Sequence, residues 1–152
     1  MSDAELSSNG DVVTSITIAA PPDAVFDHLV DPDKLIRWFG VEADIDPRPG
    51  GKFWLNVTGK DTASGAYVEV NRPSRVSFTW GWEGSEDVPP GSSMVSIDLK
   101  LEGDETLLVL THSGLPMGAD DAHKQGWVHL LERLQVVGAG GDPGPDPWHQ
   151  TE

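Results

Sequence analysis

The feature that most constrains this chain is an amphipathic pattern near its C-terminal end, between Asp121 and Val137. Apolar residues recur there at steps of three, four and one, the spacing of a single face of an α-helix. That face consists of His123, Trp127, Leu130, Leu131, Leu134 and Val137. Asp120 and Asp121 are suited to cap the first turn, and Gly138 is suited to end the helix in a left-handed conformation. A helix of about 17 residues is about 25 Å long, so its apolar face needs an equally long partner.

That partner is predicted to be a sheet, because apolar and polar residues alternate between Val41 and His112. Turn residues divide the stretch into six strands, over residues 41–46, 53–57, 66–70, 76–82, 95–101 and 106–112. A run of β-branched residues over 11–19 predicts an earlier strand. Segments headed by Pro and Asp predict two short helices, over residues 24–29 and 35–39. The order predicts an α+β domain, an antiparallel sheet of about seven strands covered by the long helix.

Composition limits the possible functions. The 152 residues fit one domain over residues 12–138, between a flexible N-terminus over 1–11 and a disordered tail over 139–152. The net charge of −15 argues against binding to nucleic acid or to membranes, since both need clustered Lys and Arg. The chain has no Cys and its five His lack metal-ligand spacing, so we expect no metal and no cofactor. No signal peptide or membrane span is recognisable, which predicts a cytoplasmic protein.

A series of local motifs runs from about Thr14 to Val137, nearly the whole chain. They are Pro22-Asp23-Ala24-Val25-Phe26, Asp31-Pro32 through Leu35-Ile36-Arg37-Trp38-Phe39, Pro49-Gly50-Gly51-Lys52-Phe53, Gly65-Ala66-Tyr67, Arg75-Val76-Ser77-Phe78-Thr79-Trp80, Leu108-Val109-Leu110-Thr111-His112-Ser113-Gly114-Leu115-Pro116 and Gly126-Trp127. In this order they resemble the START-like or SRPBCC superfamily. More narrowly, they resemble its AHSA-type branch, which is named after activators of the heat-shock-protein-90 ATPase.

The resemblance implies a helix-grip fold, in which a curved antiparallel sheet packs around the long C-terminal helix. It also implies a cavity between the sheet and that helix, which in various members holds lipids, hormones or polyketides. Members known as co-chaperones carry an additional N-terminal domain, and we expect a chain of 152 residues to have no room for one.

Aromatic residues dominate the predicted wall of such a cavity. Phe78, Trp80 and Trp82 alternate along one predicted strand and are expected to face Trp127 and Leu131 of the helix. Two interpretations stay open: the indoles fill the core, or they border a cavity that takes a ligand. The predicted ligand-binding residues are Trp38, Phe53, Phe78, Trp80, Trp82, His112 and Trp127.

His112 is the most suggestive polar residue, because alternation turns its side chain inward together with those of Leu108 and Leu110. It either fixes the orientation of a ligand or only hydrogen-bonds the turn that leads into the helix. His123 is predicted to be a core histidine. No catalytic residue is predicted, because the chain lacks Cys and a Gly-x-Ser-x-Gly motif.

The leading functional hypothesis is a non-enzymatic binding module, monomeric or homodimeric, for a small hydrophobic or aromatic molecule. One alternative is a chaperone accessory protein that binds a chaperone or a client protein through an exposed face. The other is an enzyme similar to a polyketide cyclase or dehydratase, in which His112 would exchange protons with Tyr67 or a nearby carboxylate.

Overall fold

The computed structural model describes residues 11–86, 88–115 and 120–143 and forms one bent sheet with three helices on its concave side. The elements in chain order are β1 (Val12–Ile18), α1 (Pro22–Val30), α2 (Pro32–Leu35), β2 (Glu42–Ile45), β3 (Lys52–Asn56), β4 (Thr62–Asn71), β5 (Arg75–Trp80), β6 (Ser93–Glu102), β7 (Glu105–Ser113) and α3 (Asp120–Gly138). This arrangement confirms the predicted α+β fold, with two short helices after the first strand and a long helix at the end.

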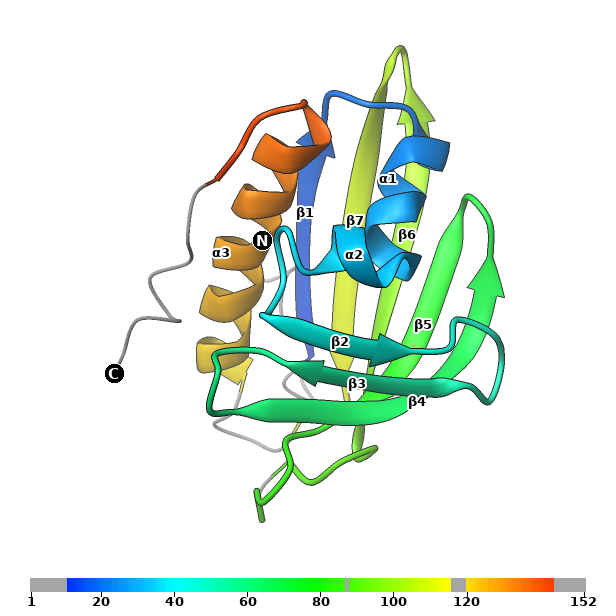
Figure 1. Cartoon of the computed structure of the whole chain (residues 1–152). Helices are drawn as coiled ribbons and strands as arrows, with labels where there is room; N and C mark the ends of the chain where they lie inside the picture. The colour runs from blue at the N-terminus through cyan, green and yellow to red at the C-terminus, as the bar shows by residue number, and fades with distance from the viewer. Residues whose placement is uncertain (1–10, 87, 116–119, 144–152) are drawn as a thin grey trace.

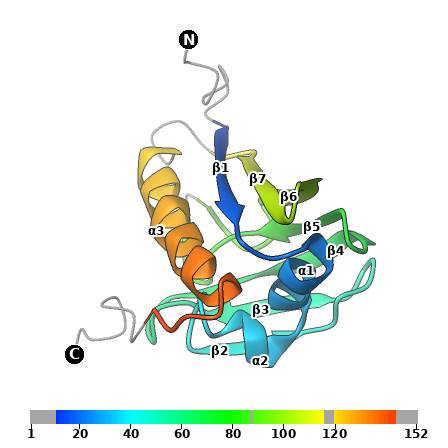
Figure 2. The same ribbon diagram turned by 90° about the horizontal axis from the view of Figure 1, so that it is seen from above.

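The strands form one antiparallel sheet in the order β1-β7-β6-β5-β4-β3-β2. Successive strands from β2 to β7 are neighbours, whereas β1 pairs with β7 at the far edge. The sheet is strongly bent: β1 and β7 stand upright in Figure 1, while β2 and β3 run across its lower half. Seen from above, the sheet curves around α3, and α1 and α2 lie on the same side (Figure 2).

Two features of β4 connect the differently oriented parts of the sheet. The pairing of β4 with β5 shifts register between Tyr67 and Glu69, as at a β-bulge, which increases the local twist of a strand. Gly65 lies so close to β5 that an added Cβ would collide with the backbone carbonyl of Thr79. Only glycine permits this approach, so the bend depends on the absence of a side chain at position 65.

The core lies between the concave face of the sheet and one face of α3. The predicted apolar face of the helix is buried from Trp127 onward: Trp127, Leu130, Leu131, Leu134 and Val137 are each at most 7% exposed, whereas His123 is half-buried. Helix α1 covers the upper part of the same core with Val25, Phe26 and Leu29. The amphipathic pattern therefore predicted which side of α3 meets the sheet.

The prediction that Gly138 ends the long helix in a left-handed conformation is wrong. Helix α3 includes Gly138, and it is Gly140 that adopts a left-handed φ of +91°. Gly141 N donates to Val136 O at 2.8 Å and Gly140 N donates to Val137 O at 3.0 Å, which are the two hydrogen bonds of a Schellman cap. Gly138 has a packing role instead, because a Cβ there would collide with the side chain of Ile18 in β1.

Two further elements end earlier than predicted. The strand expected over residues 76–82 ends at Trp80, and Trp82 forms only an isolated bridge with Ala63. Trp82 N donates to Val88 O at 2.7 Å, so the loop folds back and takes a hydrogen bond that a longer strand would use. The helix expected over residues 35–39 spans Pro32–Leu35 and continues as a turn.

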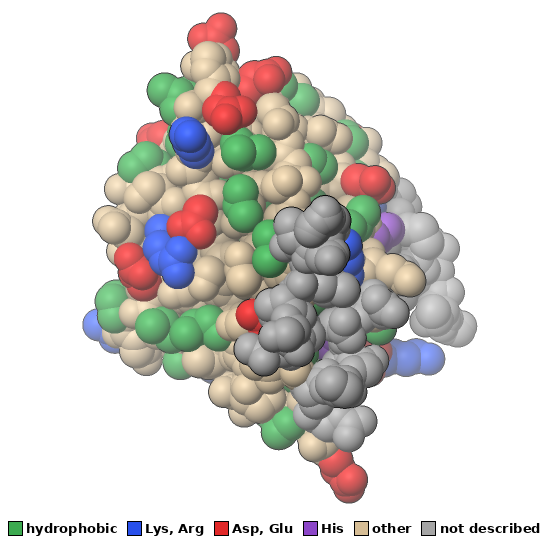
Figure 3. Space-filling model, turned by 180° about the vertical axis from the view of Figure 1, so that it is seen from behind, with side chains coloured by type: hydrophobic (Ala, Val, Ile, Leu, Met, Phe, Trp, Pro, Cys, Tyr) green, Lys and Arg blue, Asp and Glu red, His purple; other side chains and the backbone are tan. Residues whose placement is uncertain are grey.

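The outer face of the sheet carries polar side chains and ion pairs. On the face seen from behind, hydrophobic side chains are scattered among polar ones (Figure 3). Arg75 Nη1 donates to both carboxylate oxygens of Asp98, at 2.7 and 2.8 Å, and Arg75 Nε donates to Glu69 at 3.1 Å. In the described ranges no helix has the length and apolar character needed to cross a membrane.

Some of the predictions fall on other parts of the chain. The flexible N-terminus, apart from residue 11, and the tail beyond residue 143 lie outside the described residues. The same holds for the side chains of Asp120 and Asp121, and so for their predicted capping role.

Candidate ligand-binding site

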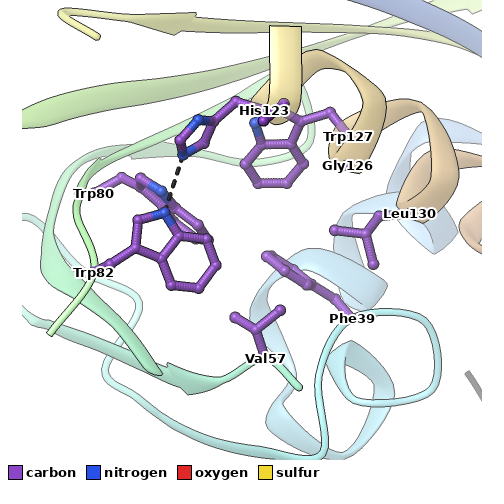
Figure 4. A pocket seen from close by; sticks show the side chains of 9 residues that line it. Phe39, Val57, Trp80, Trp82, His123, Gly126, Trp127 and Leu130 are labelled. Atoms are coloured by element: carbon purple, nitrogen blue, oxygen red, sulfur yellow. Dashed lines mark hydrogen bonds between the residues drawn. The ribbon is translucent and has the colours of Figure 1, made fainter. Parts of the chain in front are cut away.

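A half-open cavity of about 260 Å³ lies between α3 and the bent sheet (Figure 4). Its wall combines one face of α3 with residues from three other places in the chain. The lining residues are Phe39, Val57, Trp80, Trp82, Ala122, His123, Gly126, Trp127 and Leu130. Among these described residues only His123 has an ionisable side chain, so the cavity is suited to apolar groups.

The residues of α3 that line the cavity lie on one face of the helix. Positions 123, 126, 127 and 130 follow the i, i+3, i+4, i+7 pattern, which places them on one stripe of a helix. Figure 4 shows His123, Trp127 and Leu130 on the helix side of the cavity. Gly126 lies between them without a side chain, and this leaves open space beside the sheet.

The opposite wall comes from turns that follow regular elements. Asp31 begins α2 by accepting a hydrogen bond from Asp33 N at 3.0 Å. The helix is followed by a turn in which Phe39 N donates to Leu35 O at 2.9 Å. Val57 lies just beyond β3, in the turn that leads to β4. Both lining residues are therefore held by short-range hydrogen-bonded structure.

The aromatic rings of the wall support one another. Trp80 lies 5.2 Å from Trp82 and 5.3 Å from Trp127, measured between ring centroids. Phe39 stacks on Trp80 at 5.9 Å and meets Trp127 edge-on at 5.3 Å. These separations lie in the favourable range of about 4.5–7 Å for aromatic pairs. The wall is thus preorganised before any ligand enters.

A hydrogen bond connects Trp82, just beyond the end of β5, with His123 near the beginning of α3. Trp82 Nε1 donates to His123 Nε2 at 3.0 Å, as the dashed line in Figure 4 shows. An indole N–H only donates, so His123 Nε2 carries no proton and the ring proton lies on Nδ1. The bond holds Trp82 against the helix at one side of the cavity.

His112 lies behind the wall in a chain of hydrogen bonds. Trp127 Nε1 donates to His112 Nδ1 at 3.0 Å, which leaves the ring proton on Nε2. Nε2 is 2.8 Å from Ser93 Oγ and donates to it, and Ser93 Oγ donates to Trp80 O at 2.8 Å. Both ring nitrogens are thereby engaged, and the imidazole is fully buried.

Burial lowers the pKa of His112 from 6.5 to about 3, and the neighbouring His123 makes a second, smaller contribution in the same direction. The hydrogen bonds act in the same direction, because a second ring proton on Nδ1 would point at the N–H of Trp127. His112 is therefore neutral at physiological pH. Its hydrogen bonds, to Trp127 and to Ser93 beside the end of β5, position the cavity wall.

The structure distributes the seven predicted ligand-binding residues over two layers. Trp80, Trp82 and Trp127 line the cavity, whereas the other four lie outside its lining. Phe53 and Phe78 stack on each other at 4.1 Å in the core. The indole of Trp38, 1% exposed, donates to His28 O at 2.9 Å. His112 lies behind Trp80 and Trp127.

Sequence reasoning did not select several residues of the wall. Phe39 and Val57 follow the ends of their elements, where periodicity no longer indicates a direction. Gly126 and Leu130 belong to the recognised face of the helix, so the helical stripe itself contained the signal for them. His123 was also on that stripe, and the cavity gives this half-buried residue a place in the wall rather than in the closed core.

Tyr67 offers a test of the packing behind the wall. Its side chain is 2% exposed, and its hydroxyl has no hydrogen-bond partner within the described part of the chain. Burial and the charge of Asp46 raise the pKa of the hydroxyl, which keeps it protonated. Tyr67→Phe removes this unpaired group and should raise the free energy of unfolding by about 1 kcal/mol. Urea unfolding measures the change, and a clear decrease would show that the hydroxyl has a partner in solution.

Comparison with known proteins places this geometry in a family. The profile of the family described as "Activator of Hsp90 ATPase homolog 1-like protein" matches residues 19–138. The solution structure of an AHSA1-like protein from Rhizobium etli is 50% identical, covers 93% of this chain and 89% of its own, and superimposes with a TM-score of 0.73. The crystal structure of CalU16 from Micromonospora echinospora is 31% identical over 85% of this chain and 76% of its own, with a TM-score of 0.71.

A more distant structure, an HSP90 activator from Plasmodium falciparum, is 24% identical over 84% of this chain and 94% of its own, with a TM-score of 0.69. At that identity the similarity shows the fold alone. None of the curated proteins matches the chain. The profile match covers most of the chain, from just after β1 to the last residue of α3, and confirms the AHSA-type resemblance. The chain therefore belongs to the Activator of Hsp90 ATPase homolog 1-like family.

Proposed function

We propose that this protein is a cytoplasmic, non-enzymatic binding module for a small hydrophobic or aromatic ligand, held between the sheet and α3. The observation that supports this most is the half-open apolar cavity of about 260 Å³ at the edge of an otherwise closely packed core. Close packing is the rule in protein interiors. An open, aromatic-walled space of this size is therefore more typical of a binding site than of a packing defect.

The size of the cavity limits the ligand. Pockets for drug-sized molecules measure about 300–1,000 Å³, so a space of about 260 Å³ suits a compact molecule with one or two rings. Burying about 200 Å² of apolar ligand surface contributes roughly 5 kcal/mol before the costs of association. We therefore expect dissociation constants in the micromolar to millimolar range for simple aromatic probes.

The state of the polar groups supports binding rather than proton transfer. Both nitrogens of His112 are engaged, and its low pKa keeps the ring neutral. The Tyr67 hydroxyl has a raised pKa and is not among the lining residues. The two groups that an enzyme of the cyclase type would use are thus held away from the cavity.

Filling the cavity from the helix tests the proposal. Gly126→Leu places a side chain inside the wall of α3 and should weaken the binding of 2-naphthol at least tenfold, measured by isothermal titration calorimetry. Stability should be kept or increased, because glycine costs about 1 kcal/mol in a helix interior. The matched control is Gln125→Leu, on the exposed side of the same turn, which should bind like the wild type.

The design separates a lost site from a lost fold. Thermal unfolding of both variants reports the fold, and titration reports the site. A wild-type protein that shows no saturable response to any one- or two-ring aromatic probe would contradict the proposal. Equal affinities of wild type and Gly126→Leu would place the binding elsewhere.

A further inference from the structure

The exposure of the lining residues distinguishes the floor of the cavity from its mouth. The floor consists of the lining residues that are at most 4% exposed, namely Phe39, Val57, Trp80, Trp127 and Leu130. The mouth consists of the described lining residues that are half-buried or exposed, namely Trp82, Ala122, His123 and Gly126. The mouth therefore lies between Trp82, just beyond β5, and the first turns of α3.

A side-chain hydrogen bond spans this mouth. Trp82 Nε1 donates to His123 Nε2 at 3.0 Å, and the two rings lie 6.2 Å apart between centroids (Figure 4). The hydrogen bond from Trp127 to His112 also joins α3 to a strand, but it lies behind the floor. The bond at the mouth holds the indole of Trp82 against the helix, across the way into the cavity.

The backbone around Trp82 is fixed, whereas its side chain has few restraints. Trp82 N donates to Val88 O at 2.7 Å, and Glu83 N donates to Thr62 O at 2.9 Å. The indole is half-buried and is held by its bond to His123 and by an edge contact with the ring of Trp80. Rotation of an accessible side chain is faster than the movement of a loop. A wider mouth therefore requires rotation of the indole rather than displacement of the strand end.

We infer that the indole of Trp82 is the gate of the cavity and that its hydrogen bond to His123 holds the gate closed. The inference rests on the proposed binding function and adds the route by which the ligand enters and leaves. In the open position the indole turns away from α3 and the bond is broken. Because the same opening serves entry and exit, the bond slows both rates by a similar factor and has little effect on the affinity.

Removing the acceptor tests this inference. His123→Phe keeps a ring at the mouth but cannot accept the hydrogen bond of Trp82. The dissociation rate of 6-fluoro-2-naphthol, measured by ¹⁹F NMR relaxation dispersion, should rise about fivefold, as expected for the loss of one hydrogen bond. The dissociation constant, measured by isothermal titration calorimetry, should change less than twofold, so the association rate should rise by a similar factor.

Three further variants assign the effect to this bond. His123→Gln offers an amide oxygen as acceptor and should keep the slow exchange of the wild type. In a Trp82→Phe background, which lacks the donor, adding His123→Phe should leave the dissociation rate unchanged. Trp38→Phe is the matched control, because it removes an indole that donates to His28 O outside the cavity lining, and it should exchange the probe like the wild type.

Thermal unfolding of each variant reports whether it folds, so a changed rate can be separated from a lost fold. A His123→Phe variant that binds the probe and exchanges it at the wild-type rate would overturn the inference and leave the proposed function in place. A fivefold rise on adding His123→Phe to Trp82→Phe would also overturn it, because the effect would not depend on the hydrogen bond. Failure of the wild type to bind the probe would count against the proposed function and against the gate with it.

Discussion

Between pH 7 and pH 4.5 the free energy of unfolding should fall by about 2–3 kcal/mol through His112 alone. The pKa of this residue is about 3 in the folded protein, against an ordinary value of 6.5. As the pH drops below 6.5, the unfolded chain takes up a proton on this ring while the folded protein does not. The unfolded state then binds more protons, so stability rises with pH throughout this window and is lost on acidification.

Urea unfolding at a series of pH values measures this effect, with His112→Gln as the control. The glutamine side chain does not titrate, so the variant should lack about 2–3 kcal/mol of the acid-dependent loss, whatever its stability at pH 7. The comparison should stay above pH 4, because the pKa of Asp27 is also lowered, by its hydrogen bond with Arg72. That carboxylate stabilises the protein above its ordinary pKa of 3.8 and loses its effect only at lower pH. Parallel pH profiles for wild type and variant would contradict the neutral state assigned to His112.

The hydrogen bonds of the neutral His112 ring also support the wall of the cavity. His112 Nδ1 accepts the hydrogen bond of Trp127, and Ser93 continues the chain to the backbone of Trp80. A proton on Nδ1 removes the acceptor that holds the indole of Trp127 in the wall. His112 is thus a positioning residue for the site and makes its contribution without touching the ligand space.

The parts of this structure that the sequence predicts well are those where one periodicity runs without interruption. The apolar stripe from Trp127 to Val137 and the alternation along β6 and β7 each require a buried face, and both elements are long enough to show it. Burial on one side is a strong constraint, and local turn chemistry then sets the hairpin order of the strands.

Prediction fails where contacts distant in sequence decide the outcome. Glycine at position 138 is typical of a residue that ends a helix, but glycine is required there because the side chain of Ile18 in β1 lies close by. Trp82 continues the alternation of β5, yet its backbone N–H donates a hydrogen bond to Val88 O in the following loop instead of to a neighbouring strand. For the same reason, alternation alone does not separate the cavity wall from the core behind it. Trp80 lines the cavity and its strand neighbour Phe78 does not.

Trp80→Ala should lower the free energy of unfolding by about 3 kcal/mol, the largest loss that we expect from a single residue of the wall. The indole is 2% exposed and packs against the rings of Phe39, Trp82 and Trp127. Truncating a buried tryptophan costs about 3–5 kcal/mol. The lower end applies here, because the N–H of Trp80 is buried without a partner among the described residues, and its removal offsets part of the loss.

Trp82→Ala is the matched comparison, because it removes the same side chain from a half-buried position at the edge of the cavity. Its loss of stability should be about half as large, because part of the ring is already in contact with water. The change removes the ring contact with Trp80 and the hydrogen bond to His123. Both variants should bind 2-naphthol more weakly. If Trp82→Ala destabilises the protein as much as Trp80→Ala, residue 82 belongs to the core. The cavity wall would then be part of the packing that the fold requires.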